Sequence, residues 1–178
     1  MTARASAAVF VSYAREDSDA ARGIAEALRS HGFEVWLDQD ELRGGEVWDQ
    51  KLRRQIKECA LFVPVVSANT QERREGYFRL EWKLAAERTH LMAEGVPFIA
   101  PVVIDDTAEA NALVPAEFMR VQWPRVRQGH GGQAFDDPRV EAFCEQVTRP
   151  RVRQRSSVLK SHRGGGDGRS GGHEPFRP

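Results

Sequence analysis

Short apolar runs alternate with longer amphipathic segments along this chain, and that alternation limits its possible folds more than any other feature. Residues 7–13 form an apolar run that ends in a charged turn, and residues 33–37 and 60–66 are similar runs. Runs of this length are typical of strands buried on both faces of a parallel sheet. Because helical segments separate them, the sequence predicts βαβ units with helices on both faces of the sheet.

The other predicted elements follow from the spacing of apolar residues. They are a helix ended by Gly32, a helix through Trp48 and Ile56, a helix over residues 77–92, a strand over 98–104, a fifth strand over 119–123 and a last helix over 140–147. Leu80, Leu84, Ala85 and Leu91 indicate the helix over 77–92. Pro101 makes the strand over 98–104 irregular, because proline cannot donate a ladder hydrogen bond.

The last thirty residues differ in composition from the rest of the chain. Residues 149–178 hold eight basic residues against two acidic ones, together with glycine clusters. They have too few large apolar residues to offset the entropy of ordering, so they are expected to be a disordered basic tail or linker after a single domain over residues 1–148. Such a linker would lead to a sensor domain or partner. Because Phe176 is its only aromatic residue, neither nucleic acid nor a membrane is expected as its partner.

Several classes of protein are excluded by what the sequence lacks. It has no uninterrupted run of about eighteen apolar residues and no signal peptide pattern, so a soluble, cytoplasmic protein is expected. Cys59 and Cys144 share no CxxC spacing and are expected to be buried reduced thiols, with no metal site. No GxGxxG motif follows the first strand, and P-loop and HExxH motifs are absent. A phospho-receiver needs an aspartate where the third strand ends, and Ser67 stands there instead.

Five segments in order resemble the Toll/interleukin-1 receptor (TIR) domain of bacterial type. The first strand with its acidic turn lies at residues 9–17, the second strand at 32–38, and the glycine-containing loop that ends at Trp48 at 42–48. The third strand with its terminal serine lies at 61–67, and an aromatic-x-x-x-Glu element at 77–81. The resemblance spans roughly residues 7–147. It implies a flavodoxin-like α/β fold, an open parallel sheet of about five strands with helices on both faces.

The resemblance also implies a function for Glu81. By residue type alone, Glu81 is a solvated acid on a helix, paired with a nearby basic residue such as Arg79, Lys83 or Arg88. In TIR domains that cleave NAD⁺, the matching glutamate is the catalytic carboxylate. Nicotinamide is cationic when bound to the ribose and leaves as a neutral molecule, so one carboxylate that stabilises an oxocarbenium-like ribose can suffice. NAD⁺ would be the substrate, with no additional cofactor.

Around Glu81, the resemblance places seven candidate binding residues: Ser12, Tyr13, Arg15, Asp38, Arg43, Trp48 and Tyr77. Trp48 and Tyr77 would stack on nicotinamide or adenine, although Trp48 fits core packing as well, and Tyr77 stands where the family usually has Trp. Arg15 and Arg43 would meet the pyrophosphate, or else remain exposed loop charges. Asp38 would contact a ribose hydroxyl or cap the loop that follows it.

Two functions remain open at this point. The first is an NAD⁺ glycohydrolase or cyclase, activated by self-assembly and serving bacterial immune defence or interference with a host. Its loop over residues 39–46 would contact a neighbouring TIR domain in a homo-oligomer or filament. The second is a non-catalytic scaffold that signals through TIR–TIR contacts. A third possibility, nucleotide-sugar chemistry, is suggested only by the open carboxyl edge of the sheet.

Overall fold

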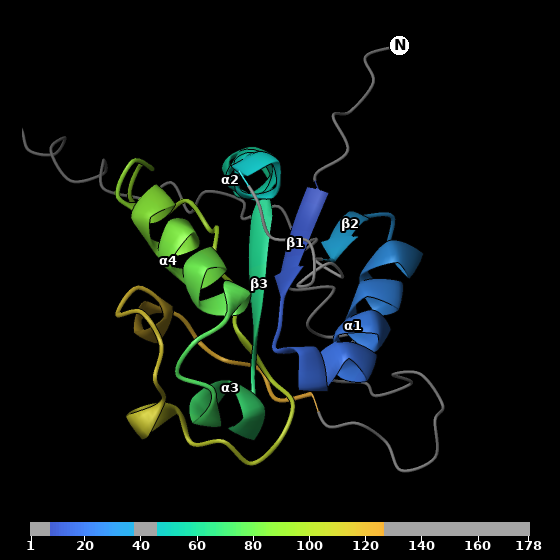
Figure 1. The fold of residues 1–178 in the computed structure, drawn as a ribbon, viewed down its shortest axis with the longest axis vertical. Coiled ribbons are helices and arrows are strands. Elements are labelled where there is room, and N and C mark those ends of the chain that lie inside the picture. Colours follow the sequence, from blue (N-terminus) through green and yellow to red (C-terminus); the bar gives the residue numbers. More distant parts are fainter. Residues whose placement is uncertain (1–7, 38–45, 127–178) are drawn as a thin grey trace, which may run out of the picture.

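The computed structural model describes residues 8–37 and 46–126 of the chain, and within them four parallel strands form one sheet (Figure 1). The strands are β1 (Ala8–Ser12), β2 (Glu34–Leu37), β3 (Leu61–Val66) and β4 (Val102–Val103), in the spatial order β2-β1-β3-β4. All pairs are parallel, and Ser12 at the end of β1 is in register with Pro64 of β3. The predicted open parallel sheet is therefore confirmed.

Helices cover both faces of this sheet, as the sequence predicts. They are α1 (Ser18–Ser30), α2 (Glu46–Glu58), α3 (Ala68–Glu72) and α4 (Tyr77–Thr89). The buried residues of α1 pack on one face with Val9 and Val11 of β1, whereas those of α2 and α4 pack on the other face with Phe10. Side chains along a strand alternate between faces, so Ser12 lies on the same face as Phe10 and α4.

The predicted fourth strand is much shorter than expected. Only Val102 and Val103 form β4, and Ile99 makes an isolated bridge to Phe62. Ala100 N donates to Phe62 O at 2.9 Å, but Pro101 has no N–H to continue the ladder. The proline that predicted an irregular strand thus divides it into two short pairings.

The fifth strand predicted over residues 119–123 is wrong in position. A short 3-10 helix, Phe118–Arg120, occupies the start of that segment. Edge pairing comes later, where Val103 N donates to Pro124 O at 3.0 Å and Val126 N donates to Val103 O at 2.7 Å. Within the described residues, which end at Val126, this pairing is a single bridge beside β4. Phe118 and Trp123 are both buried, so their packing decides the path of the segment.

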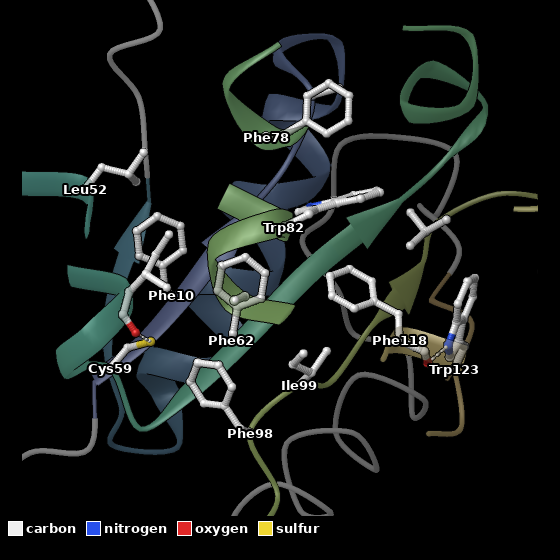
Figure 2. Close-up of a cluster of buried hydrophobic side chains, with 14 of the residues drawn as sticks. Phe10, Leu52, Cys59, Phe62, Phe78, Trp82, Phe98, Ile99, Phe118 and Trp123 are labelled. Carbon is white, nitrogen blue, oxygen red and sulfur yellow. Dashed lines mark hydrogen bonds between the residues drawn. The ribbon is translucent and has the colours of Figure 1, made fainter. Parts of the chain in front are cut away.

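The core between α4 and the sheet is rich in aromatic side chains, which Figure 2 shows gathered around Phe62 and Trp82. Phe10 stacks on Phe62 with ring centroids 5.5 Å apart. Trp82 lies 5.2 Å from Phe78 and 5.4 Å from Phe118, centroid to centroid. Contacts of this kind add stabilisation beyond the apolar area that they bury. They fix α4 rigidly over the end of β1.

The buried face of α4 differs from the one that its leucines predict. Ala85 is fully buried as predicted, and Phe78 and Trp82 are fully buried at helical spacing from it. Leu80 and Leu84 are only partly buried, and Leu91, beyond the end of the helix, is 90% exposed. The helix is where the sequence predicts it, but it is rotated so that Phe78 and Trp82 face the sheet.

Several predictions concern parts of the chain outside the described residues. These are residues 39–45 of the predicted loop over 39–46, the last helix over 140–147 and the basic tail over 149–178. Within the described ranges, no helix has the length and apolar character needed to span a bilayer.

Candidate functional site

The candidate site centres on Glu81, which lies on the buried side of α4 with 2% of its surface exposed. Ser12, at the carboxyl end of the central strand β1 and fully buried, donates a hydrogen bond from Oγ to Glu81 Oε2. The two residues are 69 positions apart in sequence. In open parallel sheets, ligands bind at the carboxyl ends of the strands, and β1 ends here. The structure therefore holds a buried carboxyl group at the edge of the sheet where such a fold places its site.

The start of α4 is fixed by Gly76. Its φ of 153° is one that residues with a side chain rarely adopt, and a Cβ there would lie 3.0 Å from Cε1 of Phe78. The chain therefore turns tightly into the helix just before Tyr77.

Arg79 joins the start of α4 to the segments around it. Its guanidinium donates to the backbone oxygens of Thr70, Arg73 and Leu113, and it lies 5.2 Å from the ring centroid of Trp82. Arg88, further along α4, donates to the oxygens of Ile56 and Cys59. Both arginines on the same helix as Glu81 thus donate to backbone carbonyl groups. Lys83, the third candidate, is exposed.

The other predicted site residues lie in several environments. Tyr77 is half-buried and precedes Glu81 by one helical turn on the same side of α4. Trp48, in the first turn of α2, is half-buried, with Lys51 Nζ 4.7 Å above its ring. Arg15 is exposed at the turn after β1.

Tyr13 does not lie with Ser12. It packs against the cluster formed by α1, on the opposite face of the sheet from α4. Strand alternation explains this, since Tyr13 directly follows Ser12. Asp38 and Arg43 lie outside the described residues.

A second buried carboxyl group, which the sequence did not single out, lies at the same edge of the sheet. Asp17 is 6% exposed and accepts hydrogen bonds from Ser67 Oγ at 2.5 Å and from Asn69 Nδ2 at 2.6 Å. Burial raises the pKa of Asp17, and the two hydrogen bonds partly oppose that rise. Asp17 thus links the turn after β1 to the segment after β3.

Asp105, after β4, continues this network. It accepts hydrogen bonds from the backbone N–H groups of Ala68, at 2.6 Å, and Thr107, at 2.9 Å. Burial alone would raise the pKa of Asp105, but hydrogen bonds from Thr107 and Ala68 bring it below its usual range. The sequence signal for this network was the presence of small polar residues where three predicted strands end. Which of these residues contact one another depends on the order of the strands in the sheet.

Cysteine or metal chemistry finds little support in the described part of the chain. Cys59 is a free, fully buried thiol, as predicted, and burial raises its pKa to about 11. Such a thiol is inert as a nucleophile. Cys144 lies outside the described residues. No cluster of three or more His, Cys, Asp or Glu side chains within residues 8–37 and 46–126 could hold a metal ion.

These features define an open α/β sheet with buried carboxyl groups at its carboxyl edge. A family model described as "TIR domain" matches residues 9–141, most of the chain. The chain therefore belongs to the TIR domain family, which confirms the resemblance of its five segments.

A curated bacterial relative is the 2′ cyclic ADP-D-ribose synthase BtTIR of Bacteroides thetaiotaomicron. It is 33% identical over 79 residues, which are 44% of this chain and 28% of that protein. The match thus spans less than a third of the relative's length.

Solved TIR structures share the fold. The TIR domains of the activated Roq1 resistosome match with a TM-score of 0.57 and 17% identity, over 80% of this chain and 99% of theirs. The TIR-STING receptor of C. gigas matches with a TM-score of 0.55 and 15% identity, over 80% of this chain and 40% of that one. At these identities the likeness concerns the fold alone.

Proposed function

We propose that this domain cleaves the bond between nicotinamide and ribose in NAD⁺, with Glu81 as the catalytic carboxylate. The observation that carries the proposal is the burial of Glu81 on α4 beside the end of β1, where Ser12 donates a hydrogen bond to it. A buried carboxyl group is costly unless it is hydrogen-bonded. The match to a bacterial cyclic ADP-ribose synthase supports the same chemistry.

The chemistry that we propose needs only one carboxylate. The C–N bond breaks, its electron pair leaves with nicotinamide, and that ring becomes neutral. Positive charge develops on the ribose, where the Glu81 carboxylate stabilises it as a glycosidase carboxylate does. Water then adds to the ribose carbon and releases a proton, which gives ADP-ribose. If a hydroxyl group of the same molecule adds instead, with loss of its proton, a cyclic isomer forms.

The remaining candidate residues have supporting roles in this proposal. Tyr77, one turn before Glu81 on α4, and Trp48 on α2 would stack on the nicotinamide or adenine ring. Arg15 is exposed after β1 and free to approach a pyrophosphate. Asp38 and Arg43 remain predicted contacts to the ribose and pyrophosphate. We further propose self-assembly with other TIR domains as the activating step and immune defence in the cytoplasm as the setting, leaving a scaffold role as the alternative.

The test is incubation of the purified full chain with NAD⁺, dilute and at high local concentration on a surface, with nicotinamide and nucleotide products separated by chromatography. The proposal expects equal amounts of nicotinamide and of ADP-ribose or its cyclic isomer. Absence of nicotinamide under both conditions, with self-association still measurable by sedimentation, would favour the scaffold.

A further inference from the structure

Ser12 is a buried hydroxyl in a strand whose other residues are apolar. All five residues of β1 are buried, and Ser12 is fully inaccessible. A buried hydroxyl needs a hydrogen-bond partner, and the partner of Ser12 is Glu81 Oε2. An alanine at this position of β1 would be buried without needing a hydrogen-bond partner for its side chain. The hydroxyl group is therefore explained by the carboxyl group opposite it.

The two ends of this hydrogen bond differ in rigidity. Ser12 lies on the central strand β1, which pairs with both β2 and β3, so its backbone is fixed. Glu81 has a flexible side chain whose terminal torsion is broad and roughly two-fold. Phe78 and Trp82 hold the helix on either side of Glu81. The hydrogen bond from Ser12 to Oε2 ties one carboxylate oxygen of Glu81 to the fixed backbone of β1.

We propose that Ser12 is a positioning residue for Glu81: its hydroxyl sets the orientation of the carboxylate at the edge of the sheet. Ser12 acts through Glu81 and not by touching substrate. Catalytic electrostatics depend on groups held in place before reaction. This role rests on the function proposed above.

The neighbouring strand offers a matched control. Ser67 follows β3, is equally buried at 1% exposure, and donates to the carboxyl group of Asp17. Ser67→Ala therefore removes a buried serine–carboxyl hydrogen bond at the same sheet edge, together with the cap bond from Thr70 N, without touching Glu81. Ser12→Thr keeps a hydroxyl group on β1, and Ser12→Cys replaces it with a weaker donor of similar size.

The experiment measures kcat and KM for NAD⁺ in the full-length variants, per folded molecule, with thermal melting as the check on folding. Ser12→Ala should lower kcat roughly tenfold to a hundredfold, as expected for loss of a hydrogen bond to a charged group. KM should change by less than about threefold, because uniform substrate binding is untouched. Ser12→Thr should recover most of kcat, Ser12→Cys should fall between, and Ser67→Ala should keep kcat close to wild type.

Three results would overturn the role of Ser12. One is a folded Ser12→Ala or Ser12→Cys protein with the kcat of wild type. Another is a Ser67→Ala protein with an equal loss of kcat, since general loosening would then explain both. The third is a Ser12→Thr protein as slow as Ser12→Ala. If the wild type cleaves NAD⁺ and Ser12 proves dispensable, this inference fails and the proposed function stands. If the wild type releases no nicotinamide, the proposed function itself fails.

Discussion

Asp17 gives the clearest test of how the carboxyl edge of the sheet is held together. Asp17→Ala removes the acceptor for Ser67 Oγ and Asn69 Nδ2. Ser67 is 1% exposed, so its hydroxyl would be left without an acceptor, at a cost of about 1–3 kcal/mol. Asn69 is half-buried and can turn toward water, so its loss is smaller, roughly 0.5–1 kcal/mol. Removal of a buried carboxyl group offsets part of this cost.

The net expectation for Asp17→Ala is a loss of about 2 kcal/mol in the free energy of unfolding. For a chain of this size, that lowers the melting temperature by roughly 4–8 °C. Asp17→Asn keeps the shape: the amide oxygen can still accept from Ser67 Oγ, and the Asn69 amide can flip so that its oxygen accepts from the new NH2 group. It should cost less than about 1 kcal/mol. Urea unfolding of the three proteins measures both losses, and equal stability of Asp17→Ala and wild type would refute the role of this network.

The same residue predicts a pH dependence. Burial raises the pKa of Asp17, and the nearby charges of Asp105 and Glu16 act in the same direction. A raised folded-state pKa means that the folded protein binds more protons than the unfolded chain, so stability falls as pH rises through that window. From about pH 4 upward, wild type should therefore lose stability relative to Asp17→Asn. Melting curves for the pair at several pH values measure this, and a difference that is constant or grows in favour of wild type would contradict it.

Two further predictions concern the core and the assembly. Trp82→Ala should cost about 3–5 kcal/mol in urea unfolding, whereas Trp82→Phe should cost clearly less because the buried indole N–H has no hydrogen-bond partner among the described residues; equal losses would contradict this. Specific activity toward NAD⁺ should rise with protein concentration if the competent state forms only between domains. A constant value across a roughly hundredfold dilution, with monomers confirmed by sedimentation, would remove the assembly step.

Local sequence patterns predicted the main elements because their signals lie within one segment. The apolar runs predicted β1 and β3, and Gly32 predicted where α1 ends. The short helix α3 was missed, although Ser67 and Thr70 form a reciprocal cap at its start. A helix of five residues has too little periodicity to be detected.

The site was harder to predict because its contacts join distant segments. Glu81 looks like an exposed helical acid until the buried positions of Phe78 and Trp82 place it on the same side of α4. Its partner Ser12 lies 69 residues away. Only the strand order, with β1 at the centre, brings them together. The Asp17 network depends on the same topology, and so neither pairing has a local signal.

The most direct test of the account compares Glu81→Gln with Glu87→Gln. Both substitutions remove one carboxylate from α4, but Glu87 is exposed and Glu81 is buried beside Ser12. Nicotinamide release is measured at the same concentration of folded protein. We expect Glu81→Gln to lose about a hundredfold to a thousandfold in rate while Glu87→Gln keeps the wild-type rate. If Glu81→Gln melts like the wild type and releases nicotinamide as fast, then Glu81 is not the catalytic carboxylate.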